Sequence, residues 1–339
     1  YGDHRDLHLS IRRQRQMCIR DRSNHMRIVF FGSPTEAVES LQLLIAAGHD
    51  IAAVYSQPAR NSGRGRNKTA TPVKLFAIQS DIPVVTPKGL RNNVEELEWL
   101  TALKADAFVV VAYGRILPEE ILQVPQMGVV NIHPSLLPKY RGPSPVVTAI
   151  LEGENTVGVT IMLLDEGMDT GPILAQSTPM RLSGTERGAE LQRALFKEGA
   201  SMLPNVLNGL QEGTLTAEPQ DDSKASVTKL INKSDAQIDW ASPAEYIERM
   251  IRAYDSWPGA FTSWNGKVLK VLDAQISSAS ASVPAVGAGV VVVDEGRVNV
   301  GTGSASIELK KVQLEGRQAI AAADFVMGQP DFHGGTLGI

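Results

Sequence analysis

The sequence predicts an α/β fold: a Rossmann-like, mostly parallel sheet with helices on both faces, followed by a small C-terminal β-barrel (OB-like) domain. Three observations predict it. Short apolar runs alternate with amphipathic stretches from Met26 to Gly213, which favours a parallel sheet covered on both faces. A polar segment without clear periodicity comes next. Short strands separated by the turn signals NGK, EGR and GTGS follow it, a spacing typical of a small barrel.

The elements of the first domain follow from hydrophobic periodicity. RIVFF ends at Gly32 and is a buried strand, and the next apolar residues recur at helical spacing until Gly48 ends the helix. Pro204 falls inside the last helical region, where we expect a kink. We expect strands at residues 27–31, 50–56, 83–86, 107–114, 129–133 and 156–164, and helical segments at 35–48, 73–80, 94–105, 119–124, 144–153 and 185–213.

The second domain begins with one amphipathic helix, ASPAEYIERMIRAYDS, with Ser242 as its cap and Pro243 in its first turn. Strands are expected at 260–264, 267–274, 289–293, 297–301 and 306–312. The predicted organisation is a leader at 1–25, a catalytic domain at 26–213, a linker at 214–231 and a barrel domain at 232–332. The leader is rich in Arg and His and lacks the apolar stretch of a signal peptide. We interpret it as non-native or disordered; a basic RNA-binding arm is the alternative.

Composition excludes several classes of protein. The net charge is −4 and the pI is about 5.9, so any contact with RNA must use a local patch. A single cysteine excludes a disulfide framework and favours a cytoplasmic location. The six histidines are scattered, so no metal is expected. No apolar run reaches the roughly 18 residues of a membrane span, so we expect no membrane partner.

Two polar side chains, Asn131 and His133, end the strand VVNIH, and the two-residue repeat places them on one face. Ligands bind beyond the carboxyl ends of strands in such sheets. The next strand runs into DEGMDTG, which can bring Asp169 to His133 from a neighbouring strand end. Each residue has a structural alternative: an Asn that fixes a turn, a packed His, and an Asp that caps a turn. Together, the three side chains favour a catalytic site.

An amide donor and an imidazole that converge on one point suit an oxyanion, and a carboxylate beside the imidazole fixes its tautomer. No Ser or Cys is obviously placed as a nucleophile. The set therefore favours direct acyl transfer to an amine, with protons moving through His133, Asp169 or a water. An NAD-dependent oxidoreductase is disfavoured because the first strand–helix turn, FFGSPTEA, contains one glycine where the dinucleotide fingerprint has three.

The motif NIHPSLLPKYRG followed by DEGMDTG resembles the signature of the folate-dependent formyltransferases. The resemblance implies that Asn131, His133 and Asp169 are catalytic and that 10-formyltetrahydrofolate is the formyl donor. It also implies that AYGRILP and SLLP line the folate site, which gives the candidates Arg115, Ile116, Leu117, Ser135, Leu136, Leu137 and Pro138. Apolar walls with backbone donors and acceptors suit a flat pterin.

The acceptor is indicated by another segment, QPARNSGRGRNK, whose structural alternative is a solvated surface loop. It is similar to the basic loop by which methionyl-tRNA formyltransferases enter the acceptor arm of initiator tRNA. The resemblance makes Arg60, Arg64, Arg66 and Lys68 candidate tRNA ligands and implies a tRNA-binding barrel at 232–332. We expect a monomer. The alternatives are a formyltransferase acting on an amino group of a nucleotide sugar and a non-catalytic RNA-binding protein; single-domain glycinamide ribonucleotide enzymes leave residues 230–330 unexplained.

Overall fold

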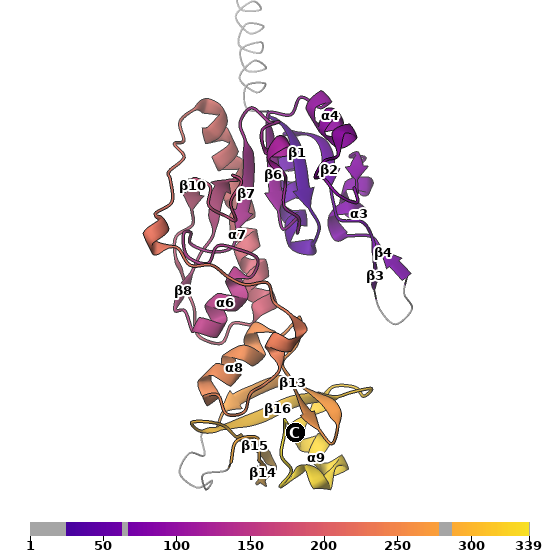
Figure 1. The fold of residues 1–339 in the computed structure, drawn as a ribbon, viewed down its shortest axis with the longest axis vertical. Helices are drawn as coiled ribbons and strands as arrows, with labels where there is room; N and C mark the ends of the chain where they lie inside the picture. The colour runs from indigo at the N-terminus through magenta and orange to yellow at the C-terminus, as the bar shows by residue number, and fades with distance from the viewer. Residues whose placement is uncertain (1–24, 63–66, 278–286, 339) are drawn as a thin grey trace, which may run out of the picture. The chain divides into compact units, whose positions relative to one another are not determined.

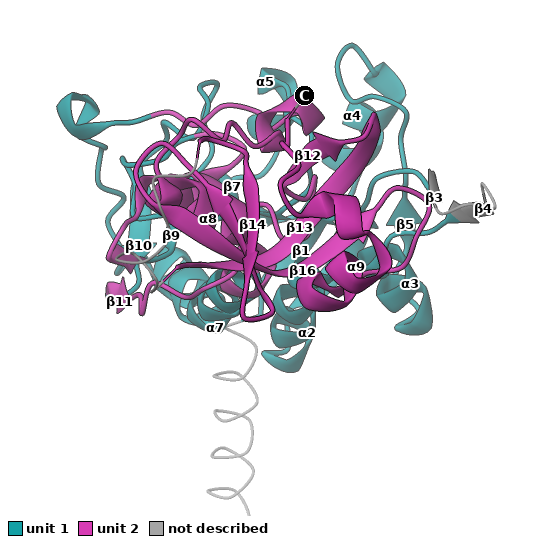
Figure 2. Cartoon of the chain, turned by 90° about the horizontal axis from the view of Figure 1, so that it is seen from below, with its two compact units in different colours: residues 1–141, 158–178, 193–226 teal, residues 142–157, 179–192, 227–339 magenta. Residues whose placement is uncertain are grey.

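The computed structural model describes residues 25–62, 67–277 and 287–338. The leader predicted at 1–25 lies outside the described residues, apart from His25. The chain divides into two compact units, which Figure 2 distinguishes by colour. Unit 1 comprises the described parts of 1–141, 158–178 and 193–226, and unit 2 comprises those of 142–157, 179–192 and 227–339. The domain limits at 213 and 232 stay a prediction.

Unit 1 contains a seven-stranded sheet in the order β10-β9-β7-β6-β1-β2-β5 (Figure 1). The strands β5, β2, β1, β6 and β7 are parallel to one another, whereas β9 runs antiparallel to β7 and β10 runs antiparallel to β9. The predicted mostly parallel sheet is therefore confirmed. The strands are β1 Arg27–Gly32, β2 Asp50–Tyr55, β5 Val84–Val85, β6 Ala107–Val111, β7 Val129–His133, β9 Thr160–Leu163 and β10 Ile173–Gln176.

Helices cover both faces of this sheet. On one face, Leu100 of α4 and Ile121 of α5 pack in a core with Phe31 and Phe108. On the other face, α7 approaches β7 closely at Gly199, where an added Cβ would lie 2.5 Å from Ile132 Cγ2. The helices with residues in this unit are η1 Thr35–Ala37, α2 Val38–Ala46, α3 Pro72–Gln79, α4 Val94–Ala102, α5 Glu119–Leu122, α7 Gly188–Glu212 and η2 Asp222–Lys224.

The single strand predicted at 156–164 is wrong, because Gly158 separates two strands that belong to different sheets. β8 (Thr156–Val157) pairs with β11 (Met180–Arg181), and β9 pairs with β7 and β10. A Cβ at Gly158 would lie 2.5 Å from Leu136 Cδ2, so the chain passes beneath the loop that follows β7 where a side chain does not fit. A uniform apolar run does not reveal such a break.

Unit 2 is built on an antiparallel sheet in the order β12-β13-β16-β15-β14, with β17 beside β16. This confirms the small C-terminal β domain. The rings of Trp264, Phe325 and Phe332 pack edge to face in its core. Its elements include α6 Pro145–Glu152, η3 Lys233–Ala236, α8 Ala244–Ala253, β12 Phe261–Trp264, β13 Lys267–Ile276, β14 Val291–Asp294, β15 Arg297–Gly301, β16 Ser306–Leu314, β17 Ile320–Ala321, α9 Ala322–Gly328 and η4 Pro330–Phe332.

The predicted cap of α8 is wrong. The residue at the cap position is Pro243, not Ser242, and no side chain from that position bonds to the helix. Instead, the hydroxyl of Ser304, which is distant in sequence, accepts a hydrogen bond from the Ala244 backbone N–H at 3.0 Å. A tertiary contact therefore satisfies a donor that local sequence rules assign to the preceding serine.

Candidate active site

Four loops of unit 1 meet at one edge of the sheet, because they follow the carboxyl ends of the parallel strands β1, β2, β6 and β7. After β1, the chain adds β2 and then β5 on one side of β1. The next strand, β6, pairs with the other side of β1. This change of direction is a topological switch point, where open α/β sheets bind ligands. The predicted catalytic strand β7 is the neighbour of β6 at this edge.

Asn131 and His133 lie on the same face of β7, as predicted, and both are buried. Ile132 between them faces α7 on the opposite side. The strand is held on both sides, by β6 in parallel register and by β9 in antiparallel register. Their backbone positions are therefore set by the sheet rather than by a flexible loop.

The His133 ring has a defined tautomer. Its Nε2 lies 2.9 Å from the carbonyl oxygen of Tyr140, and because a carbonyl only accepts, Nε2 carries the proton. In the neutral ring, Nδ1 is then the atom with a free lone pair. Nδ1 lies 3.6 Å from Oδ2 of Asp169. The sequence prediction gave the tautomer-fixing role to the carboxylate, but in the structure the Tyr140 carbonyl performs it.

Asp169 reaches His133 by a different route from the predicted one. β9 runs antiparallel to β7, with Leu163 opposite Val130, so the end of β9 lies beside the beginning of β7. The loop after β9 must therefore fold back along the sheet to bring the carboxylate to His133. The expectation of two neighbouring strand ends is wrong, although the predicted pairing of the two side chains is present.

The loop from Asp165 to Gly171 is shaped by its own side chains. Oδ1 of Asp165 accepts hydrogen bonds from the Gly167 N–H at 3.0 Å and the Thr170 hydroxyl at 2.7 Å. At Gly171 an added Cβ would lie 1.9 Å from the Leu163 carbonyl oxygen, so only glycine fits. Asp165 therefore shapes the loop, and Asp169 is its acidic residue that faces the imidazole.

Asn131 as a residue is 9% exposed, and its side-chain amide makes no hydrogen bond within the described ranges. Buried amides normally have partners. A buried amide that keeps its bonding capacity, on the same strand face as His133, can donate to a ligand oxygen placed between them.

The predicted folate residues after β6 have three different environments. Arg115 donates to the carbonyls of Pro87 and Lys88 at 3.0 and 2.8 Å, which fixes its guanidinium within the protein. Ile116 is 86% exposed, whereas Leu117 is buried in the core between the sheet and α4. Ile116 is therefore the apolar side chain of this loop that a ligand can cover.

The predicted folate residues after β7 form a rigid turn. Ser135 donates from its hydroxyl to the Lys139 carbonyl at 2.7 Å, and the Leu137 N–H donates to the Thr160 hydroxyl at 3.0 Å. Gln176 of β10 donates to the Leu137 carbonyl at 2.8 Å. Leu137 is buried, Leu136 is half-buried, and a cis bond joins Leu137 to Pro138. Neither Thr160 nor Gln176 was predicted from the sequence.

A hydrogen-bonded junction at the switch point was also not predicted. The buried Gln57 donates from Nε2 to the Tyr113 carbonyl at 3.1 Å, and its Oε1 accepts from Arg115 Nε at 3.0 Å. The Ser33 hydroxyl accepts from the Gln57 N–H at 3.2 Å. The loops after β1, β2 and β6 are thus joined. Gln57 opens the basic segment quoted above, but nothing in a single sequence separates it from the residues that follow.

Two buried tyrosines lie beneath this edge. The Tyr55 hydroxyl donates to Glu96 Oε2 at 2.5 Å, and burial raises the pKa of Tyr55. Burial also raises the pKa of Tyr113 to about 12. Across the described ranges, the Tyr113 hydroxyl has no hydrogen-bond partner. Both phenols therefore stay protonated at neutral pH.

The predicted tRNA residues fall on a hairpin formed by β3 (Arg60–Ser62) and β4 (Asn67–Thr69), which stands out from the rest of unit 1 in Figure 1. Arg60 pairs with Thr69 and Lys68 pairs with Asn61 along the backbone. Arg64 and Arg66 lie outside the described residues. Among the described residues, no group of His, Cys, Asp and Glu has a metal-binding arrangement. No helix in these ranges is long and apolar enough to cross a membrane.

An amide donor and an imidazole beside a carboxylate, at the ligand-binding edge of an α/β sheet, fit an enzyme that transfers a group through an oxyanion. The chain belongs to the formyl transferase family: the model of the formyl transferase domain matches residues 26–207, and that of the formyl transferase C-terminal domain matches residues 230–330.

Two of its relatives in the family share one named activity, that of methionyl-tRNA formyltransferase. A methionyl-tRNA formyltransferase of Chloroflexus aurantiacus is 50% identical over 254 residues, which is 75% of this chain and 81% of that protein. A methionyl-tRNA formyltransferase of Dehalococcoides mccartyi is 40% identical over 322 residues, which is 93% of this chain and 100% of that protein.

Solved structures share the fold at lower identity. HypX from Aquifex aeolicus in complex with tetrahydrofolic acid is 19% identical, with a TM-score of 0.62 over 89% of this chain, which spans 47% of the HypX chain. An N-formyltransferase from Helicobacter canadensis, in complex with folinic acid and dTDP-3-aminofucose, is 20% identical, with a TM-score of 0.62 over 84% of this chain and 98% of that one.

Proposed function

We propose that this protein transfers the formyl group of 10-formyltetrahydrofolate to the α-amino group of methionine on initiator methionyl-tRNA, for translation initiation. The observation that carries the chemistry is the arrangement of Asn131, His133 and Asp169 at the sheet edge. The identity of the acceptor is supported by the relatives named methionyl-tRNA formyltransferase. We propose that the reaction takes place in the cytoplasm and that the protein acts as a monomer.

The side chains divide the reaction between them. Asn131 donates its amide proton to the formyl oxygen, which becomes negative as the amine nitrogen adds to the formyl carbon. His133 and Asp169 take the proton that the amine loses: Nδ1 has the free lone pair, and the carboxylate 3.6 Å away stabilises the imidazolium. The pair returns a proton to the folate nitrogen when its bond to the formyl carbon breaks. The products are formyl-methionyl-tRNA and tetrahydrofolate.

Folate recognition rests on the loops after β6 and β7. Ile116 supplies an exposed apolar surface, and Met168, next to the catalytic Asp169, is 56% exposed. Arg115, Leu117 and the turn from Ser135 to Pro138 hold this surface in place through internal bonds and burial. A flat pterin needs such apolar walls with backbone polar groups between them.

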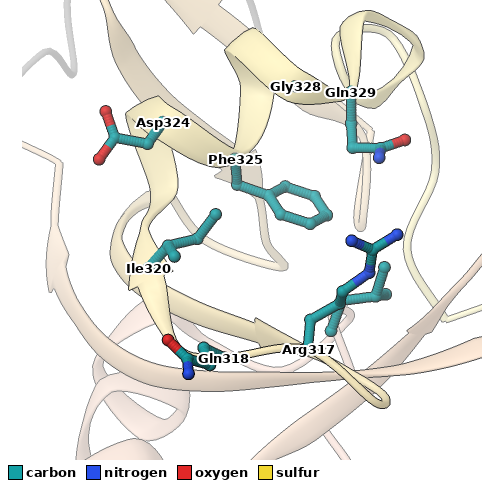
Figure 3. A pocket seen from close by; sticks show the side chains of 8 residues that line it. Arg317, Gln318, Ile320, Asp324, Phe325, Gly328 and Gln329 are labelled. Carbon is teal, nitrogen blue, oxygen red and sulfur yellow. The ribbon is translucent and has the colours of Figure 1, made fainter.

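The acceptor is bound by the β3–β4 hairpin in unit 1 and by the barrel in unit 2. Arg60, Arg64, Arg66 and Lys68 contribute phosphate contacts, which are salt-dependent and insensitive to sequence. In unit 2, a pocket of about 330 Å³ near α9 is lined by Arg317 and Gln329 beside the Phe325 ring (Figure 3). A guanidinium next to an aromatic edge suits a phosphate and its base.

The assay that tests this proposal supplies the full-length protein with 10-formyltetrahydrofolate and either methionyl-initiator tRNA or an amino-sugar nucleotide. Formyl-methionine on the tRNA is the expected product. Formylation of the amino sugar alone identifies the nucleotide-sugar alternative instead. Arg64→Ala should lower use of tRNA and leave the folate KM unchanged; loss of both indicates misfolding.

A further inference from the structure

A short polar segment, residues 218–226, bonds to the loops that carry the catalytic side chains, although the sequence predicts a linker there. Gln220 is its central residue. Its Nε2 donates to the carbonyl of Asp169 at 2.9 Å and to the carbonyl of Gly171 at 2.7 Å. Its Oε1 accepts from Nε of Arg141 at 3.0 Å. One amide thus joins two carbonyls of the loop after β9 to an arginine that follows β7.

The orientation of this amide is fixed by chemistry. A guanidinium only donates and a carbonyl only accepts, so Oε1 must face Arg141 and Nε2 must face the loop. Arg141 is 7% exposed, and its Nη2 donates to Asp222 Oδ1 at 2.7 Å. Arg141 is therefore buried, and its guanidinium fixes the orientation of the Gln220 amide.

The loop that Gln220 holds needs external support, because Asp169 has φ = 54°. A non-glycine residue in the left-handed region carries strain and keeps that conformation only where its surroundings enforce it. The hydrogen bond from Gln220 Nε2 to the Asp169 carbonyl helps to hold Asp169 in this conformation. Its loss would allow the backbone to relax and move the carboxylate relative to His133 Nδ1.

The same segment also supports the imidazole. The Ser226 hydroxyl accepts from the Tyr140 N–H at 2.9 Å, and the Tyr140 carbonyl receives the His133 Nε2 proton. The Ser226 carbonyl accepts from the Arg141 N–H at 2.8 Å. Residues 220–226 thus support both members of the proposed catalytic pair. Gln220 bonds to the backbone of Asp169, and Ser226 bonds to Tyr140, which in turn bonds to His133.

We propose that Gln220 is a positioning residue for formyl transfer, which fixes the Asp169 carboxylate against His133 by bonding the Asp169 and Gly171 carbonyls of its loop. This inference rests on the proposed function, because it assigns to Asp169 a part in proton transfer. The bonds of the Gln220 amide go to the loop after β9 and to Arg141, so we assign it no contact with either substrate. Its effect is therefore on turnover and not on the binding of either substrate.

Gln220→Glu tests it, since glutamate keeps the acceptor for Arg141 and replaces the two N–H donors. We expect kcat to fall about 10- to 100-fold, the loss that a small misplacement of a catalytic group produces, with unchanged KM for folate and tRNA. Gln220→Met, which removes all three bonds at similar volume, should lose at least as much. The matched control is Gln79→Glu, the same change at an exposed position of unit 1, and its kcat should equal that of the parent.

A double-mutant cycle distinguishes positioning from a general structural role. In the Asp169→Asn background, Gln220→Glu should have no further effect on kcat. An equal loss in both backgrounds, or parental kcat for Gln220→Glu with an unchanged melting temperature, overturns the inference. If the parent protein formylates no methionyl-tRNA, the proposed function itself fails. If Asp169→Asn retains the turnover of the parent protein, Asp169 takes no part in proton transfer. The inference about Gln220 is then overturned as well.

Discussion

Arg115 donates from Nε to the side-chain oxygen of Gln57 at 3.0 Å, and this bond joins the loop after β6 to the loop after β2. The loop after β6 carries the exposed Ile116, and Gln57 directly precedes the segment that leads into the β3–β4 hairpin. A single buried amide thus connects the proposed donor site to the proposed acceptor hairpin.

Replacing Gln57 by Leu should weaken donor binding. The change removes the acceptor of Arg115 Nε and one donor to the Tyr113 carbonyl. Arg115 keeps its bonds to the Pro87 and Lys88 carbonyls, so the expected loss is that of two hydrogen bonds, each worth about 0.5–1.5 kcal/mol. We expect the KM for 10-formyltetrahydrofolate to rise about tenfold, with a smaller change in kcat. Steady-state kinetics at saturating tRNA measure it. Gln79→Leu is the matched control, and a normal donor KM for Gln57→Leu would separate this bond from folate binding.

Asn131→Ala should lower kcat by roughly 10²–10³-fold, the usual loss of one oxyanion donor. The amide has no bond to the described part of the protein, so its removal breaks no internal hydrogen bond and should change the melting temperature little. Single-turnover kinetics with saturating substrates give the chemical rate. Parental turnover in the folded variant excludes Asn131 from the mechanism.

His133→Asn and Asp169→Asn should lower kcat by similar factors, and the double variant should lose little more than either one. The two side chains act on one proton, so their effects are not additive. The measurement is kcat for the four proteins of the cycle. Multiplying losses would show that the residues serve separate steps.

The sequence predicted that His133 and Asp169 lie together, but not the backbone geometry that brings them together. Apolar alternation identified β7 and the position of Asn131 and His133 on one face. It did not identify the antiparallel direction of β9 or the break at Gly158, because strand direction and sheet membership depend on partners elsewhere in the chain.

The supporting residues had no sequence signal. Gln57, Gln176 and Gln220 are single amides, and the backbone carbonyls to which they donate lie 39 or more residues away. Left-handed backbone at Tyr140 and Asp169 is equally hidden, because neither residue type requires it. Tertiary hydrogen bonds, which periodicity does not encode, impose these features.

Glu186 should make a pH-dependent contribution to stability. Burial pushes its pKa upward, but hydrogen bonds from the Ser183 N–H and hydroxyl and from the Gly184 N–H outweigh this and lower the pKa to about 2. A depressed folded-state pKa stabilises the fold above the unfolded value of about 4.5, and this contribution is lost as pH falls from there to 2.

The measurement compares thermal unfolding of the parent with Glu186→Gln between pH 6 and 2. Other carboxylates titrate in both proteins, so the difference in melting temperature isolates Glu186. We expect the parent to be the more stable protein above about pH 5 and the difference to shrink toward pH 2. A constant difference across this range contradicts the low pKa.

Gly199→Ala should damage the site from the opposite face of the sheet. The new Cβ would lie 2.5 Å from Ile132 Cγ2 and 2.9 Å from Val159 Cγ1, and overpacking of this kind costs about 1–3 kcal/mol. Ile132 lies between Asn131 and His133 on β7, so under the proposed mechanism a displaced Ile132 should also lower kcat. Urea unfolding and steady-state kinetics measure the two effects. Gly89→Ala, where no atom lies within 4 Å of the new Cβ, is the matched control.

Ile132→Ala provides the partner for a double-mutant cycle, because it removes the Cγ2 atom that the new Cβ meets. On its own it should cost about 2–5 kcal/mol as a large-to-small core change. Combined with Gly199→Ala, the total loss should be smaller than the sum of the single losses by about 1 kcal/mol or more, since Ile132→Ala removes the closest clash of the new Cβ and leaves only the one with Val159 Cγ1 at 2.9 Å. Additive losses would mean that α7 accommodates the methyl group by moving away from β7, and kcat of Gly199→Ala should then equal that of the parent.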